Sequence, residues 1–206
     1  DTLFFVGGEV GVGAAVSSCA CLLYDRLFSV AKTMNSTATE AVTGVPTRYQ
    51  STTSTDADYE GGNFLLPTAL TTIANTAHNW TVCTYTDQGG NASTLPSFAG
   101  VAATPSNFLD TVVPAWFAPL EAGDVGIQTL TQMQCDASVA TGTIDFTIGH
   151  PIAWLPSVAG QVQTVVDGIN SAFQVTRIFD DAALAILTQP VGSNHSVYGQ
   201  FKTVSG

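Results

Sequence analysis

Residues 76–86 constrain the fold most, because their side chains alternate as they do along a β-strand. Trp80, Val82 and Thr84 fall on one face of this segment, and the intervening residues fall on the other. The next five residues, Asp-Gln-Gly-Gly-Asn at 87–91, tolerate positive φ angles and predict a turn. Residues 92–95 would begin the return strand, so we expect a β-hairpin here.

Several other segments also have strand character. In residues 143–148, Ile144, Phe146 and Ile148 are predicted to face inward, whereas Asp145 and Thr147 are predicted to face outward. Further strands are predicted at 19–30, at 112–120 as an edge strand, at 127–135, at 182–187 as a central strand, and at 198–204. A short helical turn is predicted within 160–173. This spacing of strands favours an all-β fold, either a jelly roll or a β-sandwich.

The N-terminal residues 1–18 are predicted to form an extended, glycine-rich arm, followed by a single β domain over residues 19–206. The apolar run from Leu3 to Leu23 also raises two alternatives, a membrane-spanning helix and a signal peptide. Glu9 and the interrupting glycines argue against both. Because exposed Phe4 and Phe5 side chains would be costly in water, we expect the arm to extend onto a neighbouring molecule.

The charge of the chain narrows the classes of partner. Charged residues make up 10% of the sequence, and 16 acidic residues against 5 basic ones give a net charge of −11. A nucleic-acid-binding protein needs a basic face, and anionic lipid headgroups would repel this chain. We therefore expect neither nucleic acid nor a membrane as a partner. Hydrophobic residues make up 45% of the sequence, which favours either an oligomer that buries apolar surface between its subunits or a large β core.

Common catalytic templates are absent from the sequence. It contains no nucleophile elbow, phosphate-binding loop, dinucleotide fingerprint or zinc-protease helix motif. His78, His150 and His195 are candidate bases or metal ligands. The last two are predicted to lie in turns, and no sequence motif indicates that any of the three belongs to a catalytic triad. We therefore assign no catalytic, cofactor-binding or metal-binding residue and expect the protein not to be an enzyme.

The acidic segment from Asp56 to Glu60 has carboxylates at alternate positions before a glycine, as the start of an EF-hand loop does. The bidentate acid that closes such a loop would fall at Pro67, which has no carboxylate. A solvated loop is therefore expected, with a calcium site of another type as the alternative.

The cysteines allow three complete disulfide pairings, among which the sequence does not choose. Free thiols are favoured for a protein made in a cytoplasm. Zinc-site spacing is absent around them, so elemental analysis is expected to find no structural or catalytic transition metal. The four are Cys19, Cys21, Cys83 and Cys135.

Trp80, Trp116 and Trp154 raise the question of sugar binding, because aromatic rings stack on sugars. Each is surrounded by apolar residues, so a place in the core is the favoured interpretation. A glycosidase would need two carboxylates held across the scissile bond, and the sequence does not give their separation.

Four segments resemble, in the same order, motifs of a family of uncharacterised virion structural proteins of tailed bacteriophages. The departures are Phe28, where the family often has Trp, and Val125, where it often has Thr. Together the motifs span most of residues 22–206. They are 23–28 (LYDRLF) with 45–49 (VPTRY), 82–91 (VCTYTDQGGN), 117–127 (FAPLEAGDVGI) and 181–185 (DAALA).

This resemblance implies a virion component and brings no catalytic residue with it. We expect a capsid decoration, or cement, subunit on the outer capsid surface, synthesised in the host bacterial cytoplasm. Its partners would be the major capsid protein and further copies of itself, with a homotrimer favoured. Deleting residues 1–18 should then weaken its association with the particle while leaving the fold intact. The alternatives are a head-fibre or tail component that binds host surface glycans and, third, a glycan-acting enzyme.

Overall fold

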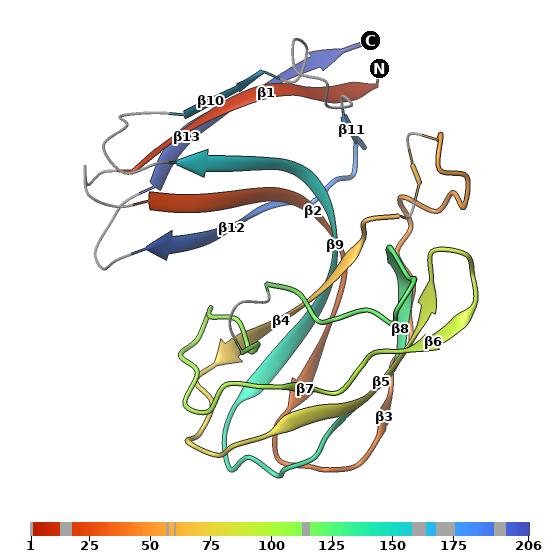
Figure 1. The fold of residues 1–206 in the computed structure, drawn as a ribbon, viewed down its shortest axis with the longest axis vertical. Helices are drawn as coiled ribbons and strands as arrows, with labels where there is room; N and C mark the ends of the chain where they lie inside the picture. Colours follow the sequence, from red (N-terminus) through yellow and green to blue (C-terminus); the bar gives the residue numbers. More distant parts are fainter. Residues whose placement is uncertain are drawn as a thin grey trace. The chain divides into compact units, whose positions relative to one another are not determined.

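The computed structural model describes residues 2–12, 18–56, 58–59, 61–112, 116–157, 164–167, 176–191 and 197–206, and the predicted all-β fold is confirmed for them. These residues contain no helix long and apolar enough to cross a lipid bilayer. The strands, shown in Figure 1, are β1 (Leu3–Val12), β2 (Ser18–Thr33), β3 (Glu40–Ala41), β4 (Phe64–Thr71), β5 (Asn79–Asp87), β6 (Ala92–Thr94), β7 (Phe98–Ala99), β8 (Ile127–Cys135), β9 (Thr143–Ser157), β10 (Thr164–Asp167), β11 (Thr176–Ile178), β12 (Leu184–Val191) and β13 (Val197–Ser205).

The strands pair in antiparallel sheets, an arrangement consistent with a β-sandwich. In the first sheet, β10 and β11 pair with different stretches of β1, whereas β13 pairs along nearly its whole length. Since a strand has two edges, β10 and β11 share one edge of β1 and β13 occupies the other. The second sheet has the order β12-β2-β9-β4, and the third has the order β3-β8-β5-β6 with β7 also paired to β5.

The chain divides into two compact units, each with its own core. Unit 1 comprises residues 1–25 and 151–206, and unit 2 comprises residues 26–150. In unit 1, Phe5 and Val10 from β1 pack with Leu23 from β2 and Leu155 from β9. These side chains come from two different sheets, so the core of unit 1 lies between two β layers.

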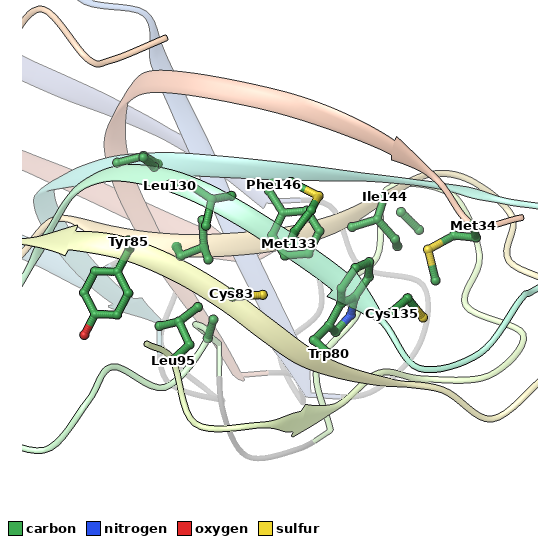
Figure 2. Close-up of a cluster of buried hydrophobic side chains, with 14 of the residues drawn as sticks. Met34, Trp80, Cys83, Tyr85, Leu95, Leu130, Met133, Cys135, Ile144 and Phe146 are labelled. Atoms are coloured by element: carbon green, nitrogen blue, oxygen red, sulfur yellow. The ribbon is translucent and has the colours of Figure 1, made fainter. Parts of the chain in front are cut away.

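The core of unit 2 also joins strands of two sheets (Figure 2). Ile144 and Phe146 from β9 pack with Trp80 from β5 and Met133 from β8. The rings of Trp80 and Phe146 meet edge to face, with centroids 4.6 Å apart and an interplanar angle of 86°. This geometry is favourable for aromatic pairs, so it adds to the free energy gained from burying their apolar surface.

The predicted hairpin is confirmed in unit 2, but the faces predicted for its first strand are wrong. Trp80, Cys83 and Tyr85 all lie in the core, because the pairing of β5 with β8 shifts register between Trp80 and Val82. Thr84, Tyr85 and Thr86 of β5 pair with residues of β6, and the turn between them contains Gly90 with a φ of 83°. The predicted strand at 127–135 is confirmed as β8, with the same bounds.

The alternation in β9 identified the inward face correctly, but the opposite face is buried as well. Ile144, Phe146 and Ile148 lie in the core of unit 2 as predicted. Asp145 and Thr147, predicted to face outward, are also buried. Arg26 donates a hydrogen bond to Asp145 across 2.7 Å, and the Thr147 hydroxyl donates to the same carboxylate. These hydrogen bonds satisfy the buried polar groups, so polar side chains are compatible with burial on this face of β9.

Three predicted elements differ from the structure. Of residues 112–120, predicted as an edge strand, 113–115 lie outside the described residues and the others form no strand. Residues 116–120 are attached to β4 by a backbone hydrogen bond from Ala118 to Leu65 and a stack of Phe117 on Phe64. The segment predicted as a central strand forms the end strand β12 of its sheet. Within 160–173, residues 164–167 form strand β10 rather than a helical turn, and the others lie outside the described residues.

The structure of the N-terminal residues also differs from the extended arm that the sequence predicted. Residues 3–12 form β1 and pair with β10, β11 and β13, so they belong to a sheet of unit 1 instead of preceding a single domain over 19–206. The partner strands lie more than a hundred positions after β1 in the chain, and the local composition of β1 does not indicate a pairing with such distant segments. Phe5 and Val10 of β1 are buried in the core of unit 1, so the structure argues against the expectation that deleting residues 1–18 would leave the fold intact. Contact of the N-terminal residues with a neighbouring molecule stays a prediction.

Candidate functional site

Unit 2 contains a buried histidine–carboxylate network around Asp110. The Nε2 atom of His78 lies 3.0 Å from Asp110, and both side chains are fully buried. Asp110 also accepts hydrogen bonds from the Trp80 indole at 2.8 Å and from the backbone N–H of Val101 at 2.8 Å. The backbone of Gly100 passes so close that a Cβ atom there would lie 2.1 Å from His78 Nε2.

The charge state of His78 depends on this network. Burial by itself lowers the pKa of the imidazole, but the hydrogen bonds to Asp110 and Thr76 and the charges of Asp110 and Asp136 outweigh it. The pKa of His78 is therefore raised above its ordinary value of 6.5. In the described part of the chain, the hydrogen-bond partners of this pair are Thr76, Trp80 and Val101, none of which is a catalytic nucleophile here, and the backbone of Gly100 lies against the imidazole. These contacts tie the loop after β7 to β5 and give the pair a structural role.

A second network joins two of the segments that carry the phage resemblance. Tyr85 donates a hydrogen bond to Asp124 and accepts one from the backbone N–H of Glu121 at 3.0 Å. The Gln88 side-chain oxygen accepts bonds from the backbone N–H groups of Val125 and Gly126, at 2.9 and 3.1 Å. Burial, and then the bond to Asp124, raise the pKa of Tyr85 to about 12, which keeps the phenol a donor at neutral pH.

The remaining resemblance segments also supply polar contacts within the units. In unit 1, Asp25 is fully buried and accepts a bond from the backbone N–H of Ala183 at 2.8 Å. In unit 2, the Arg48 guanidinium is buried and donates to the Arg26 carbonyl at 3.3 Å. Segments far apart in the sequence are thereby linked through charged side chains whose hydrogen bonds offset the cost of burial.

Replacing Gln88 with alanine tests the second network. The loop containing Val125 and Gly126 would lose its shared acceptor, so we expect the free energy of unfolding to fall by about 1–2 kcal/mol. The amide protons of both residues should exchange faster in hydrogen–deuterium exchange. Gln132→Ala is the matched control, since the Gln132 side chain is exposed and accepts one bond of 3.4 Å from Thr84. Unchanged exchange at both amides would contradict the assigned role of Gln88.

The other sequence candidates are dispersed. His150 lies within β9, instead of in the predicted turn, with its ring stacked 3.7 Å from Tyr49 and its Nδ1 2.6 Å from Asn63. His195 and Glu60 lie outside the described residues. Asp56 accepts a hydrogen bond from the Ser51 hydroxyl. In the described part of the chain, no group of three or more His, Cys, Asp or Glu side chains is placed to hold a metal ion.

The cysteines are free and buried. Cys19 and Cys21, two residues apart on β2, have sulfur atoms 3.5 Å from each other. Burial, and then the neighbouring thiol, raise the pKa of Cys21 to about 12, and burial raises that of Cys83 to about 12. Thiols with raised pKa values are poor nucleophiles at neutral pH, so Cys21 and Cys83 act as small apolar residues.

The three tryptophans have different environments. Trp80 is buried in the core of unit 2, as the sequence favoured, and Trp116 is half-buried. Trp154 on β9 is 47% exposed, so its ring is accessible on the surface of unit 1. Sequence reasoning missed Asp110, which has no distinguishing motif around it.

Comparison with protein-family models, curated proteins and solved structures finds no match to this chain. The geometry of its own residues therefore provides the basis for a functional proposal.

Proposed function

We propose that the protein is a structural component of a tailed-phage virion, a decoration subunit that stabilises the capsid from outside. One observation supports this role above the others. The segments that resemble phage virion motifs use their polar side chains to hold the fold together, as Tyr85 and Gln88 do at the loop containing Asp124. Residues used in this way suit a protein whose task is to keep its shape and present contact surfaces.

The charge distribution supports an outward position. The net charge of −11 would oppose contact with the polyanionic DNA packed inside a phage head. A decoration protein binds the assembled shell and not its free subunits, so its binding free energy favours the assembled state. Such binding requires extended, shape-matched surfaces and no catalytic pocket. The proposed partners are the major capsid protein and further copies of this chain.

Particles that lack the protein provide the direct test. They should still assemble but rupture at a lower temperature, or under milder osmotic shock, than complete particles. Adding purified protein back should restore resistance, and cryo-electron microscopy should locate many copies on the outside of the shell. A few copies confined to the tail or to the portal vertex would contradict the proposal.

The exposed ring of Trp154 favours one alternative, a head-fibre or tail component that binds host surface glycans. In that case Trp154→Ala should abolish binding to glycans extracted from the host envelope, because ring stacking on the sugar would be lost. Val165→Ala, at another exposed apolar position of unit 1, is the control. Absence of glycan binding by the unaltered protein would exclude this alternative.

A further inference from the structure

We propose that β12 and β13 form the surface through which copies of this chain associate. This inference deepens the proposed function, because it identifies the interface of the expected homo-oligomer. It rests on five observations about these two strands: their position at sheet edges, the exposure of their apolar side chains, the hollow that these side chains line, their lack of negative charge and their size.

Both strands lie at the edge of a sheet in unit 1. β13 pairs with β1, and none of the described strands pairs with its outer edge. β12 pairs with β2 and is the end strand of its own sheet. The outer edge of such a strand presents backbone N–H and C=O groups that readily pair with another chain. Natural proteins protect such edges with charges or by covering them, and covering by a second copy is the solution proposed here.

Apolar side chains are unusually exposed on the two strands. All nine residues of β13 are exposed, including Tyr198, Phe201 and Val204. Leu184 and Ile186 of β12 are exposed as well. Of the thirteen large exposed hydrophobic side chains in the described residues, eight belong to unit 1, although unit 2 contributes about twice as many described residues. Apolar exposure concentrated in this way is typical of an interaction surface.

The exposed side chains of the two strands meet at one hollow. Its volume is about 80 Å³, and Ile186 from β12 and Val197, Tyr198 and Phe201 from β13 contribute to its wall. Leu155 from the core of unit 1 also lines it. The hollow is far smaller than the roughly 300–1,000 Å³ of typical small-molecule sites, so a protein side chain fits it better than a ligand does.

The charge of the surface indicates that the occupant is a second copy. β12 contains no charged residue, and β13 contains only Lys202. Two chains that each carry a net charge of −11 would repel one another at most contact surfaces. An interface without carboxylates avoids placing like charges opposite each other. A basic partner, by contrast, would be recognised by an acidic surface, which these strands do not provide.

The size of the surface also fits this occupant. The two strands contribute eight and nine residues. A specific protein interface uses about 20–30 residues on each side, so the two strands supply most of one standard interface. An isologous contact would pair each copy's β13 with the other's. Contact between β12 of one copy and β13 of the next would be heterologous, the type of contact that forms rings such as a trimer when its rotation closes.

The experiment is sedimentation velocity of the full chain over a range of concentrations. The unaltered protein should form an oligomer. Tyr198→Glu and Val204→Glu, which add negative charge to exposed positions of β13, should each raise the dissociation constant at least about tenfold, equivalent to about 1.4 kcal/mol. Phe108→Glu is the matched control, because Phe108 is an exposed aromatic residue of unit 2 and should leave association unchanged.

Hydrogen–deuterium exchange of the unaltered protein provides a second measurement if a variant fails to fold. Protection of the amides of β13 should decrease when the protein is diluted below its dissociation constant. A monomer at every concentration would overturn the inference, and so would an oligomer weakened by Phe108→Glu but not by the β13 variants. A monomer that still decorates particles would leave the proposed function intact, whereas an oligomer absent from particles would contradict only that function.

Discussion

Replacing Asp110 with alanine is expected to lower the free energy of unfolding by about 3–5 kcal/mol, the usual cost of removing one partner from a buried charged pair. The loss arises because His78 and the Trp80 indole would remain buried without their shared acceptor. The N–H of Val101 would lose its partner too. Urea unfolding followed by tryptophan fluorescence measures the change, since Trp80 itself lies in the network.

Asp136→Asn is the matched control for this prediction. The Asp136 carboxylate also accepts hydrogen bonds from β5, at 2.6 and 2.7 Å from the backbone and side chain of Asn79, but the residue is exposed. Water can replace those bonds, so the loss should be about 1 kcal/mol or less. Equal effects of the two substitutions would contradict the view that burial makes Asp110 important.

The same network makes stability depend on pH. Because the pKa of His78 in the folded protein is raised above 6.5, folding favours the protonated imidazole. This contribution is fully present below pH 6.5 and is lost as the pH rises through the folded-state pKa. His78→Gln should therefore remove the decline in stability that the unaltered protein shows across that range.

Replacing Phe146 with alanine should also lower the free energy of unfolding by about 3–5 kcal/mol. The side chain is fully buried in unit 2, and its removal would leave a cavity and abolish the edge-to-face contact with Trp80. Thermal unfolding monitored by circular dichroism measures the effect. Phe108→Ala is the control, since Phe108 is 62% exposed and its truncation should change stability by about 0.5 kcal/mol or less. Similar losses for both would show that Phe146 does not anchor the core.

Local sequence patterns predicted the elements whose signal is confined to neighbouring residues. The existence of the β5–β6 hairpin follows from the strand-forming residues up to 86 and from a turn that accepts positive φ at Gly90, although the irregular register of β5 was not predictable from its alternation. β8 follows from its own composition, and the inward face of β9 follows from its period of two. Each of these features depends on the conformation of a few consecutive residues.

Tertiary structure alone decided how those elements are covered and paired. Asp145 occupies an outward position of the alternation but is buried, and its hydrogen-bond donor Arg26 lies more than a hundred residues earlier in the chain. Residues 182–187 have the apolar character of a central strand, but β12 has a partner on one edge and lies at the end of its sheet. His78 and Asp110, separated by 32 positions, meet because β5 and the loop after β7 converge. A period of two identifies the faces of a strand, but whether each face is covered depends on segments distant in sequence, and one sequence does not specify which of these come together.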